Sequence, residues 1–286
     1  MAKHGQMAGK TCMVTGASRG IGFYTAQALA RKGAHVVLIG HHHGRGQEAV
    51  DKIHQADPEA SATFFYTDLM DQAQIRELNR TFRERYDRLD VLVNNAGAFF
   101  LRRGESPDGI ERTFALNHLN YFLVTNLLLD LIKESAPARI VNVSSESHRG
   151  NRMHFDDLEF ERRPYWGLNA YGESKLANLL FTYELDRRLG QDDVTVNALH
   201  PGFVNTHIGK QYPLLRPIMN ILHALFAKSP EEGAETVIYL ASSPDVAGVS
   251  GKYFIDKEPV RSSSASYETG DARRLWEVSE SMIGLK

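Results

Sequence analysis

The chain has 286 residues, of which 42% are hydrophobic and 24% charged, and its formal net charge is −2. This length allows one large α/β domain or two small ones, and the balanced charge excludes a strongly basic nucleic-acid-binding surface. The single cysteine, Cys12, cannot form an internal disulfide, which fits a reducing compartment, and its place in an apolar run predicts a buried thiol.

The N-terminal segment, MAKHGQMAGK, has no apolar stretch of the kind that marks a secretory signal, and we expect residues 1–9 to be flexible. The longest uncharged run, 113–129, is short for a membrane span and contains several Asn and His residues. These features predict no membrane anchor, no nucleic-acid partner and a cytoplasmic location.

Apolar runs typical of strands alternate with amphipathic segments typical of helices along the chain. The expected strands are 11–15, 35–39, 62–67, 90–94, 139–143, 194–199 and 252–255. The expected helices are 20–32, 46–56, 71–86, 109–134, 170–189 and 230–242. Solidly apolar strands indicate a sheet covered on both faces, and strict alternation indicates parallel strands. The chain, 1–286, is therefore predicted to be a single Rossmann-type α/β domain with a doubly wound parallel sheet of about seven strands.

Two long segments interrupt this alternation, and both follow the carboxyl ends of expected strands, where open α/β sheets bind ligands. Residues 146–169 are polar and aromatic, whereas residues 202–229 contain apolar side chains at helical spacing. The second segment could be a lid on the substrate side, a subunit contact or ordinary core packing.

The stretch 15–22, TGASRGIG, follows the first expected strand and opens the first expected helix. Glycine permits positive φ and a close approach of the backbone to a pyrophosphate, and a helix N-terminus attracts anions. Gly16, Gly20 and Gly22 therefore suit a dinucleotide site, although a plain turn between strand and helix has the same composition.

Further motifs follow in a fixed order. They are Asp68-Leu69, Asn94-Asn95-Ala96-Gly97, Asn117, Ser144-Ser145, Tyr171-Gly172-Glu173-Ser174-Lys175 and Pro201-Gly202. With the glycine turn they resemble the short-chain dehydrogenase/reductase family, over nearly the whole chain. The resemblance implies an oxidoreductase that transfers hydride between a nicotinamide cofactor and a small-molecule carbonyl or alcohol.

Tyr171 and Lys175 lie four residues apart in an expected helix, so their side chains share a face. A Lys ammonium near a phenol favours the phenolate and lowers the pKa of the phenol, which makes Tyr171 a usable general acid and base. The resemblance implies that Ser145 polarises the carbonyl and that Lys175 also binds the ribose. It further implies that Asn117 holds a proton-relay water, where an isolated Asn in a helix would simply bond to nearby backbone.

The resemblance also assigns a cofactor site. Asp68 would accept a hydrogen bond from the adenine amino group, unless it caps the following helix. The segment 94–97 would lie along the ribose, and Pro201-Gly202 with Thr206 would pack on the nicotinamide carboxamide. The expected cofactor-binding residues are Gly16, Ser18, Arg19, Gly20, Ile21, Gly22, His41, Asp68, Leu69, Asn94, Asn95, Ala96, Gly97, Tyr171, Lys175, Pro201, Gly202, Val204 and Thr206.

The second expected strand ends at Gly40, without the acidic residue that usually binds the adenine ribose in NAD-preferring relatives. Arg19 could pair with the 2′-phosphate of NADP, or be a solvated loop charge, and His41 occupies a place where many NADP-using relatives have Arg. NADP(H) is thus the preferred cofactor, with NAD(H) as the other candidate. The adjacent histidines His41 to His43 diverge along the chain and have no carboxylate at ligand spacing, so we expect no metal.

The distance from Ser145 to Tyr171 is longer than in the commonest members, which resembles the retinol-dehydrogenase-like branch. Side chains placed by sequence around the pocket mouth favour an apolar substrate: Phe99, Phe100, Leu101, His148, His154, Trp166 and Phe203. Helices 109–134 and 170–189 pair subunits in many relatives, so a homodimer is possible. The alternative to an enzyme is a non-catalytic dinucleotide-binding regulator or scaffold with the same fold.

Overall fold

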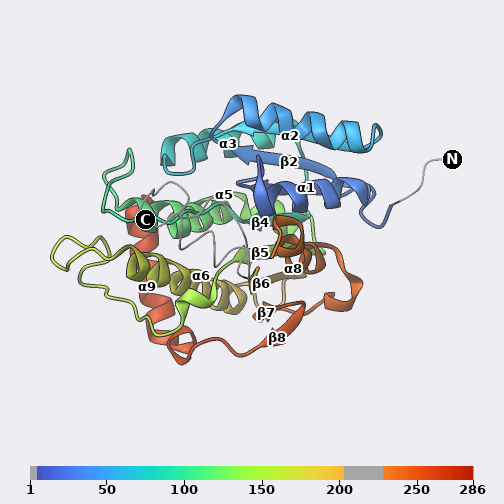
Figure 1. Ribbon diagram of the computed structural model, residues 1–286. Coiled ribbons are helices and arrows are strands. Elements are labelled where there is room, and N and C mark those ends of the chain that lie inside the picture. The colour runs from blue at the N-terminus through green and yellow to red at the C-terminus, as the bar shows by residue number, and fades with distance from the viewer. Residues whose placement is uncertain (1–4, 203–227, 286) are drawn as a thin grey trace.

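The computed structural model describes residues 5–202 and 228–285 (Figure 1). In these ranges, one sheet runs in the order β3-β2-β1-β4-β5-β6-β7-β8. The strands are β1 Thr11–Thr15, β2 His35–Gly40, β3 Ser61–Tyr66, β4 Val91–Asn94, β5 Ala138–Val143, β6 Val194–His200, β7 Tyr253–Ile255 and β8 Glu258–Val260. The α-helices are α1 Gly20–Arg31, α2 His43–Ala56, α3 Gln72–Arg85, α4 Arg112–Phe114, α5 Asn120–Glu134, α6 Gly167–Leu189, α8 Pro230–Ser242 and α9 Thr269–Met282. A π-helical turn, η1, covers Ala115–Leu119, and short 3₁₀ turns are η2 Glu146–His148, η3 Pro244–Val246 and η4 Ser264–Tyr267.

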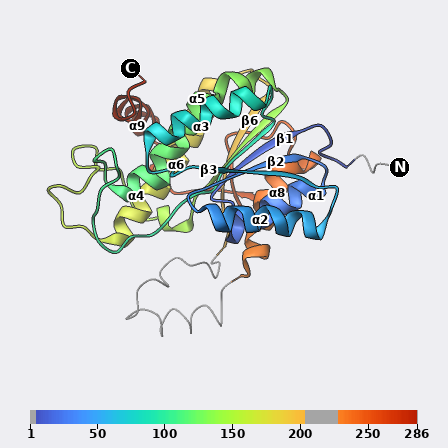
Figure 2. The ribbon, with the colours of Figure 1, turned by 90° about the horizontal axis from the view of Figure 1, so that it is seen from above.

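The predicted doubly wound sheet is confirmed, with helices on both faces (Figure 2). Helices α1, α2 and α8 cover one face, and α3, α5 and α6 cover the other. Met13 of β1 lies opposite both Val37 of β2 and Leu92 of β4, and all three side chains are fully buried. Because the chain leaves β1 toward β2 on one side and later returns to β4 on the other, the sheet has its topological switch point there. A ligand crevice is therefore expected at the carboxyl ends of these two strands.

The sequence predicted about seven strands, and the structure adds an eighth, β8. This short edge strand is exposed, contains Pro259 and pairs antiparallel with β7. Asp256 and Lys257 in the hairpin turn have positive φ values of 50° and 69°. Three exposed residues with a proline have no hydrophobic alternation, so the usual sequence signal for a strand is missing.

Residues 5–9, which we expected to be flexible, instead pack against the domain. The Met7 side chain is 7% exposed, and its backbone N–H donates to the Lys32 carbonyl over 2.9 Å. The Gln6 side chain donates to the Ser242 carbonyl at the end of α8 over 2.8 Å. The expectation was wrong for these residues because burial of one methionine anchors a segment that otherwise has a flexible composition.

Ion pairs of Arg163 connect the 146–169 segment to α6. The Arg163 guanidinium donates to both carboxylate oxygens of Glu173, over 2.9 and 3.0 Å, and also binds Asp157 over 3.3 Å. The guanidinium carbon also lies 4.1 Å from the centre of the Phe160 ring. This bidentate and stacked arrangement suits Arg specifically, so the insertion is an ordered part of the domain.

Helix α9, which the sequence did not predict, covers the outer side of α5 and α6. The Trp276 ring of α9 lies 4.8 Å from that of Phe122 in α5 and 5.8 Å from that of Phe181 in α6. In the predicted helix 170–189, which was expected to pair subunits, Leu179, Leu180 and Phe181 are 0%, 0% and 2% exposed within this chain. These three side chains are therefore not available to a second subunit.

Trp276→Ala is expected to lower the free energy of unfolding by about 3–5 kcal/mol, because it leaves a cavity between α9, α5 and α6. Denaturant unfolding followed by circular dichroism measures the change. Trp166, which is 68% exposed, provides the matched control, and Trp166→Ala should change stability by less than about 0.5 kcal/mol. Equal losses in the two variants would contradict a role for α9 in the core.

Candidate active site

The glycine turn after β1 is packed so closely that side chains would not fit. Gly16 has a φ of +66°, and a Cβ added there would lie 2.9 Å from the Ala96 Cα. A Cβ on Gly22 would lie 2.5 Å from the Gly16 carbonyl oxygen and 2.6 Å from the Asn95 amide nitrogen. Gly20, with φ +61°, begins α1. Gly16 and Gly22 therefore allow the turn to pack against the segment after β4, whereas Gly20 has open space around it and supplies the positive φ.

The N-terminus of α1 fits an anionic group. No side chain caps it, and its first turn contains no acidic residue. Its first N–H groups therefore lack side-chain acceptors, and the positive end of the helix dipole favours a phosphate. The cradle and the uncapped helix together match the pyrophosphate of a dinucleotide. Ile21 in this turn is 9% exposed and packs into the core behind it.

A basic corner lies between α1 and α2. Arg19 is exposed, and partial burial together with the charge of Arg45 lowers the pKa of the Arg19 guanidinium. The Ser18 hydroxyl approaches the end of β2, since it would lie 3.5 Å from a Cβ added to Gly40. His41 follows this strand and is exposed. Arg45 is a further member of this corner that the sequence patterns did not indicate, although a basic residue in the first turn of the helix after β2 is a usable signal.

The other two histidines beside His41 have separate structural contacts. The His42 side chain accepts from the Arg45 backbone N–H over 3.3 Å and caps α2. The His43 ring stacks on Tyr66 with a centroid distance of 4.1 Å and an interplanar angle of 6°. These contacts turn the two imidazoles toward different neighbours rather than toward one shared ligand.

Asp68 and Leu69 follow β3, where the adenine was expected. The Asp68 carboxylate accepts from the Met70 N–H over 3.0 Å, and Leu69 is 5% exposed. Asp71, rather than Asp68, caps α3 by accepting from the Gln74 N–H over 3.2 Å and from the N–H before it. The alternative of Asp68 as a helix cap is therefore wrong, because the helix begins after Asp71.

The segment after β4 contains two asparagines with different contacts. The Asn94 amide donates to Thr125 over 3.0 Å and to Asn142 over 2.9 Å, inside the fully buried core. Asn95 donates from its amide to the Thr15 carbonyl over 2.7 Å, which joins the loops after β1 and β4. Asn94 thus fixes the end of β4 within the core, while Asn95 connects the loops that follow β1 and β4.

Asn117 lies in η1, not in a continuous helix as expected. Its side-chain oxygen accepts from the Ala98 N–H over 2.8 Å, and its amide donates to the Ala98 carbonyl over 2.9 Å. The amide also donates to the Ser174 hydroxyl over 3.0 Å. A Cβ on Gly97 would lie 3.1 Å from the Asn117 oxygen and 3.5 Å from the Lys175 ammonium nitrogen. Asn117 therefore connects the loop after β4 to α6 through hydrogen bonds. The π-helical turn η1 orients its side chain toward both segments.

The two serines after β5 have different surroundings. Ser144 is 2% exposed, and its hydroxyl donates to the Lys175 carbonyl over 2.8 Å. The Ser145 hydroxyl is partly accessible, accepts from the Ser147 N–H over 3.2 Å and forms a hydrogen bond with Tyr171. Of these two hydroxyls, that of Ser145 lies beside the Tyr171 phenol, whereas that of Ser144 is bound to the backbone of α6.

Tyr171 and Lys175 share one face of α6, as the four-residue spacing predicted. The Lys175 Nζ lies 5.6 Å from the centre of the Tyr171 ring and donates to the Val143 carbonyl over 3.1 Å. Burial lowers the pKa of Lys175 to about 7. Burial also raises the pKa of Tyr171 to about 12, and a hydrogen bond with Ser145 opposes this rise only in part.

The expected lowering of the pKa of Tyr171 by Lys175 was therefore wrong for this structure. Its physical cause is desolvation of both groups, which disfavours the phenolate and the ammonium alike. At neutral pH the phenol keeps its proton, and Lys175 is close to its titration point. Such strongly shifted groups in contact with one crevice are typical of catalytic sites.

The remaining expected residues lie after β6. Pro201 and Gly202 end the described range, and Gly202 has a φ of +86°, which suits glycine. Val204, Thr206, Phe203 and nearly all of the 202–229 segment lie outside the described residues. The Phe99 ring packs edge-on against Tyr171, with the two centroids 5.9 Å apart.

Comparison with known proteins decides the family. Residues 10–214 match the family described as short chain dehydrogenase. The chain belongs to this family. Retinol dehydrogenase 14 of Mus musculus is 44% identical, over 98% of this chain and 88% of that protein. An uncharacterized protein of known structure from Mycobacterium Paratuberculosis is 30% identical with a TM-score of 0.79, over 99% of this chain and 96% of that one.

The short-chain dehydrogenase described here is therefore an NAD(P)-dependent oxidoreductase of CH–OH and C=O groups, related to retinol dehydrogenases. The RhlG/NADP complex of Pseudomonas aeruginosa has the same fold, with 27% identity and a TM-score of 0.69 over 89% of this chain and 97% of that one. Within the described residues, no helix combines the length and apolar character needed to cross a bilayer.

Proposed function

We propose that the protein transfers hydride between NADP(H) and the carbonyl or alcohol group of an apolar small molecule, with Tyr171 as the general acid and base. The observation that carries this proposal is the meeting of Ser145, Tyr171 and Lys175 beside a glycine cradle at the carboxyl ends of the strands. When bound, the nicotinamide supplies or accepts the hydride.

The residues of this chain would handle the proton and the developing charge. The Ser145 hydroxyl would donate to the substrate oxygen, and the Tyr171 hydroxyl would give it a proton as negative charge develops. The pKa of about 12 keeps Tyr171 protonated at neutral pH, which is the form that carbonyl reduction needs. Lys175 would bind the ribose and, with a pKa of about 7, exchange protons with solvent through a water beside Asn117.

The cofactor site would consist of the cradle and the loops around it. Gly16, Gly20 and Gly22 would admit the pyrophosphate, with Ser18 and Ile21 shaping the turn. Asp68 and Leu69 would flank the adenine, while Asn95, Ala96 and Gly97 would line the ribose. Pro201, Gly202, Val204 and Thr206 would contact the carboxamide.

The preference for NADP(H) over NAD(H) rests on the basic corner. Arg19 and Arg45 are close enough to interact electrostatically, and β2 ends in Gly40 without a carboxylate. Two guanidinium groups beside an adenosine ribose suit a 2′-phosphate, with His41 as a further donor. That a solved structure of the same fold contains NADP agrees with this assignment.

Arg19→Ala and Arg45→Ala should each weaken NADPH binding by about 10- to 100-fold and leave NADH binding within about 3-fold, because only NADPH carries the second phosphate. Titration of protein fluorescence with each cofactor measures both constants. Arg31→Ala, at the opposite end of α1, is the control and should alter neither. An equal loss for both cofactors would contradict the 2′-phosphate assignment.

The substrate class follows from the relatives and the crevice. A relative named for retinol acts on an apolar alcohol, and Phe99 presents an apolar ring beside Tyr171 here. We expect oxidation of long apolar alcohols and reduction of the matching aldehydes. Cofactor absorbance during incubation with aliphatic, aromatic and terpenoid carbonyls tests the function. Cofactor binding without turnover of any of them would favour a regulator or scaffold instead.

A further inference from the structure

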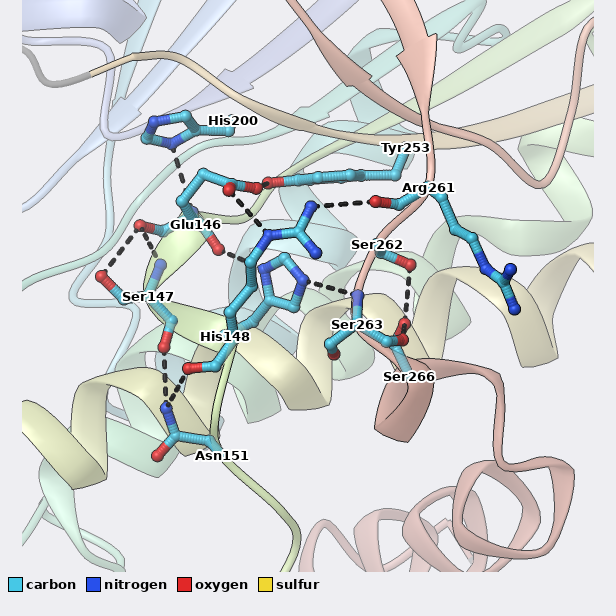
Figure 3. A network of polar contacts seen from close by, with 12 residues as sticks. Glu146, Ser147, His148, Asn151, His200, Tyr253, Arg261, Ser262, Ser263 and Ser266 are labelled. Atoms are coloured by element: carbon cyan, nitrogen blue, oxygen red, sulfur yellow. Dashed lines mark hydrogen bonds and ion pairs between the residues drawn. The ribbon is translucent and has the colours of Figure 1, made fainter.

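His148 does not line the crevice as its place in the sequence suggested. Its side chain is fully buried, and its ring contacts the backbone of Ser145. The Nδ1 atom lies 2.6 Å from the Ser145 carbonyl oxygen, and Nε2 lies 3.1 Å from the Ser263 backbone nitrogen. Figure 3 shows the imidazole between η2 and the segment that contains Ser263. The Tyr253 ring packs edge-on against it, with centroids 5.3 Å apart.

These two partners determine where the imidazole carries its proton. A carbonyl oxygen only accepts hydrogen bonds, so Nδ1 must be the protonated nitrogen facing Ser145. A backbone amide only donates, so Nε2 must present its lone pair to Ser263. The neutral ring with a proton on Nδ1 is thus the one form that satisfies both contacts. Burial lowers the pKa of His148, which favours this neutral form.

The bond from Nδ1 restrains the backbone of Ser145. This residue is extended, with φ −163° and ψ 152°, and its hydroxyl caps η2 by accepting from the Ser147 N–H. Fixing the Ser145 carbonyl fixes the peptide plane next to the Cα that carries the hydroxyl. That plane also contains the Glu146 N–H and leads directly into η2, whose Ser147 N–H orients the Ser145 hydroxyl.

The segment that contains the donor, Ser263, is itself fixed by several hydrogen bonds. Ser262, next to Ser263, shares its hydroxyl with Tyr183 of α6 over 2.7 Å and with Ser266 over 2.7 Å. From the residue after η2, the Arg149 guanidinium donates to the Arg261 carbonyl over 2.9 Å (Figure 3). The Ser263 N–H is therefore a fixed donor, supplied by a segment more than a hundred residues away from the loop that it supports.

We propose that His148 is a positioning residue that holds Ser145 in its working orientation, anchored by the backbone N–H of Ser263. This inference rests on the proposed role of Ser145 as the group that polarises the substrate. It assigns to the C-terminal segment after β8 an effect on hydride transfer, although that segment contributes no side chain to the Ser145 contact.

A substitution at Ser263 can remove the backbone N–H that donates to His148. The Ser263 φ of −68° is the value that proline imposes, so Ser263→Pro deletes the N–H at a backbone angle that proline adopts. The Ser263 hydroxyl is buried without a hydrogen-bond partner among the described residues, so Ser263→Ala keeps the N–H and loses no hydrogen bond. We expect kcat to fall about 10-fold in Ser263→Pro relative to Ser263→Ala, with cofactor affinity unchanged.

Substitutions of His148 itself provide a second comparison. His148→Leu removes both contacts and should lower kcat by about 10²-fold. His148→Asn keeps an N–H donor near the position of Nδ1 and should recover most of that loss. Equal losses in the two variants, at equal cofactor affinity, would overturn the role of the Nδ1 contact.

Two readouts do not depend on fold stability. Nitrogen NMR of the wild-type protein should show His148 neutral and protonated on Nδ1; a proton on Nε2 would overturn the inference. Loss of the Ser263 N–H removes a contact that only the neutral ring accepts, so the pKa of His148 followed by NMR should be higher in Ser263→Pro than in Ser263→Ala. The charges of Glu146, Arg149 and His200 around the ring are the same in both Ser263 variants.

Ser145→Ala separates the two proposals. Wild-type turnover in Ser145→Ala would contradict the proposed function of the serine, whatever the His148 variants do. A large loss in Ser145→Ala combined with full activity of Ser263→Pro and His148→Leu would overturn the positioning role alone. A loss of turnover in Ser145→Ala, Ser263→Pro and His148→Leu, with the expected sizes given above, supports both the role of Ser145 and the positioning role of His148.

Discussion

Tyr171→Phe is expected to lower kcat for carbonyl reduction by about 10²- to 10⁴-fold, because it removes the proton donor and leaves the ring in place. The Tyr171 ring packs edge-on against Phe99, and phenylalanine preserves that contact. Among the described residues, the hydrogen bond that the phenol loses is the one with Ser145. Folding and cofactor binding should therefore survive the substitution.

The rate of NADPH oxidation with an apolar aldehyde measures the effect, and fluorescence titration with NADPH verifies that the variant still binds cofactor. Tyr239→Phe is the matched control, since Tyr239 belongs to α8 on the opposite face of the sheet. Turnover by Tyr171→Phe within a few-fold of wild type would assign the proton transfer to another group.

Sequence patterns predicted most of the sheet and the site, since both depend on local signals. The strands β1, β2 and β4 each contain an uninterrupted apolar stretch, and a glycine turn at the end of β1 has few alternatives. The four-residue spacing of Tyr171 and Lys175 is enough to place both side chains on one face of α6. Motifs of this kind encode their geometry within a few residues.

What the sequence did not predict depends on contacts between distant segments. His148 was placed at the pocket mouth, yet its partner Ser263 is 115 positions away along the chain. The proximity of the Arg19 and Arg45 guanidinium groups likewise depends on how the turn after β1 lies against the start of α2. The pKa of Tyr171 was expected to fall because the spacing shows a neighbouring Lys but not the burial that both groups share.

Lys175→Met is expected to abolish turnover while it raises the free energy of unfolding by about 3 kcal/mol near neutral pH. Burial lowers the pKa of Lys175 from 10.5 to about 7, so the folded protein binds fewer protons here than the unfolded chain between these values. Each pKa unit corresponds to about 1.4 kcal/mol, from which the lost hydrogen bond to Val143 subtracts about 1 kcal/mol. That carbonyl keeps two longer contacts, from Tyr121 and Asn178, each 3.4 Å.

The sign of the pH dependence makes this prediction specific. The destabilisation by Lys175 is complete below about pH 7 and disappears as the pH rises toward 10.5. The gain in Lys175→Met should therefore shrink across that interval in denaturant titrations. Lys52→Met, at a side chain that is 57% exposed, should change stability by less than about 0.5 kcal/mol at every pH. A less stable Lys175→Met variant, or a gain independent of pH, would contradict the buried-charge explanation. If the gain is found, the fold is more stable without this ammonium, and the cofactor and the proton path are what require it.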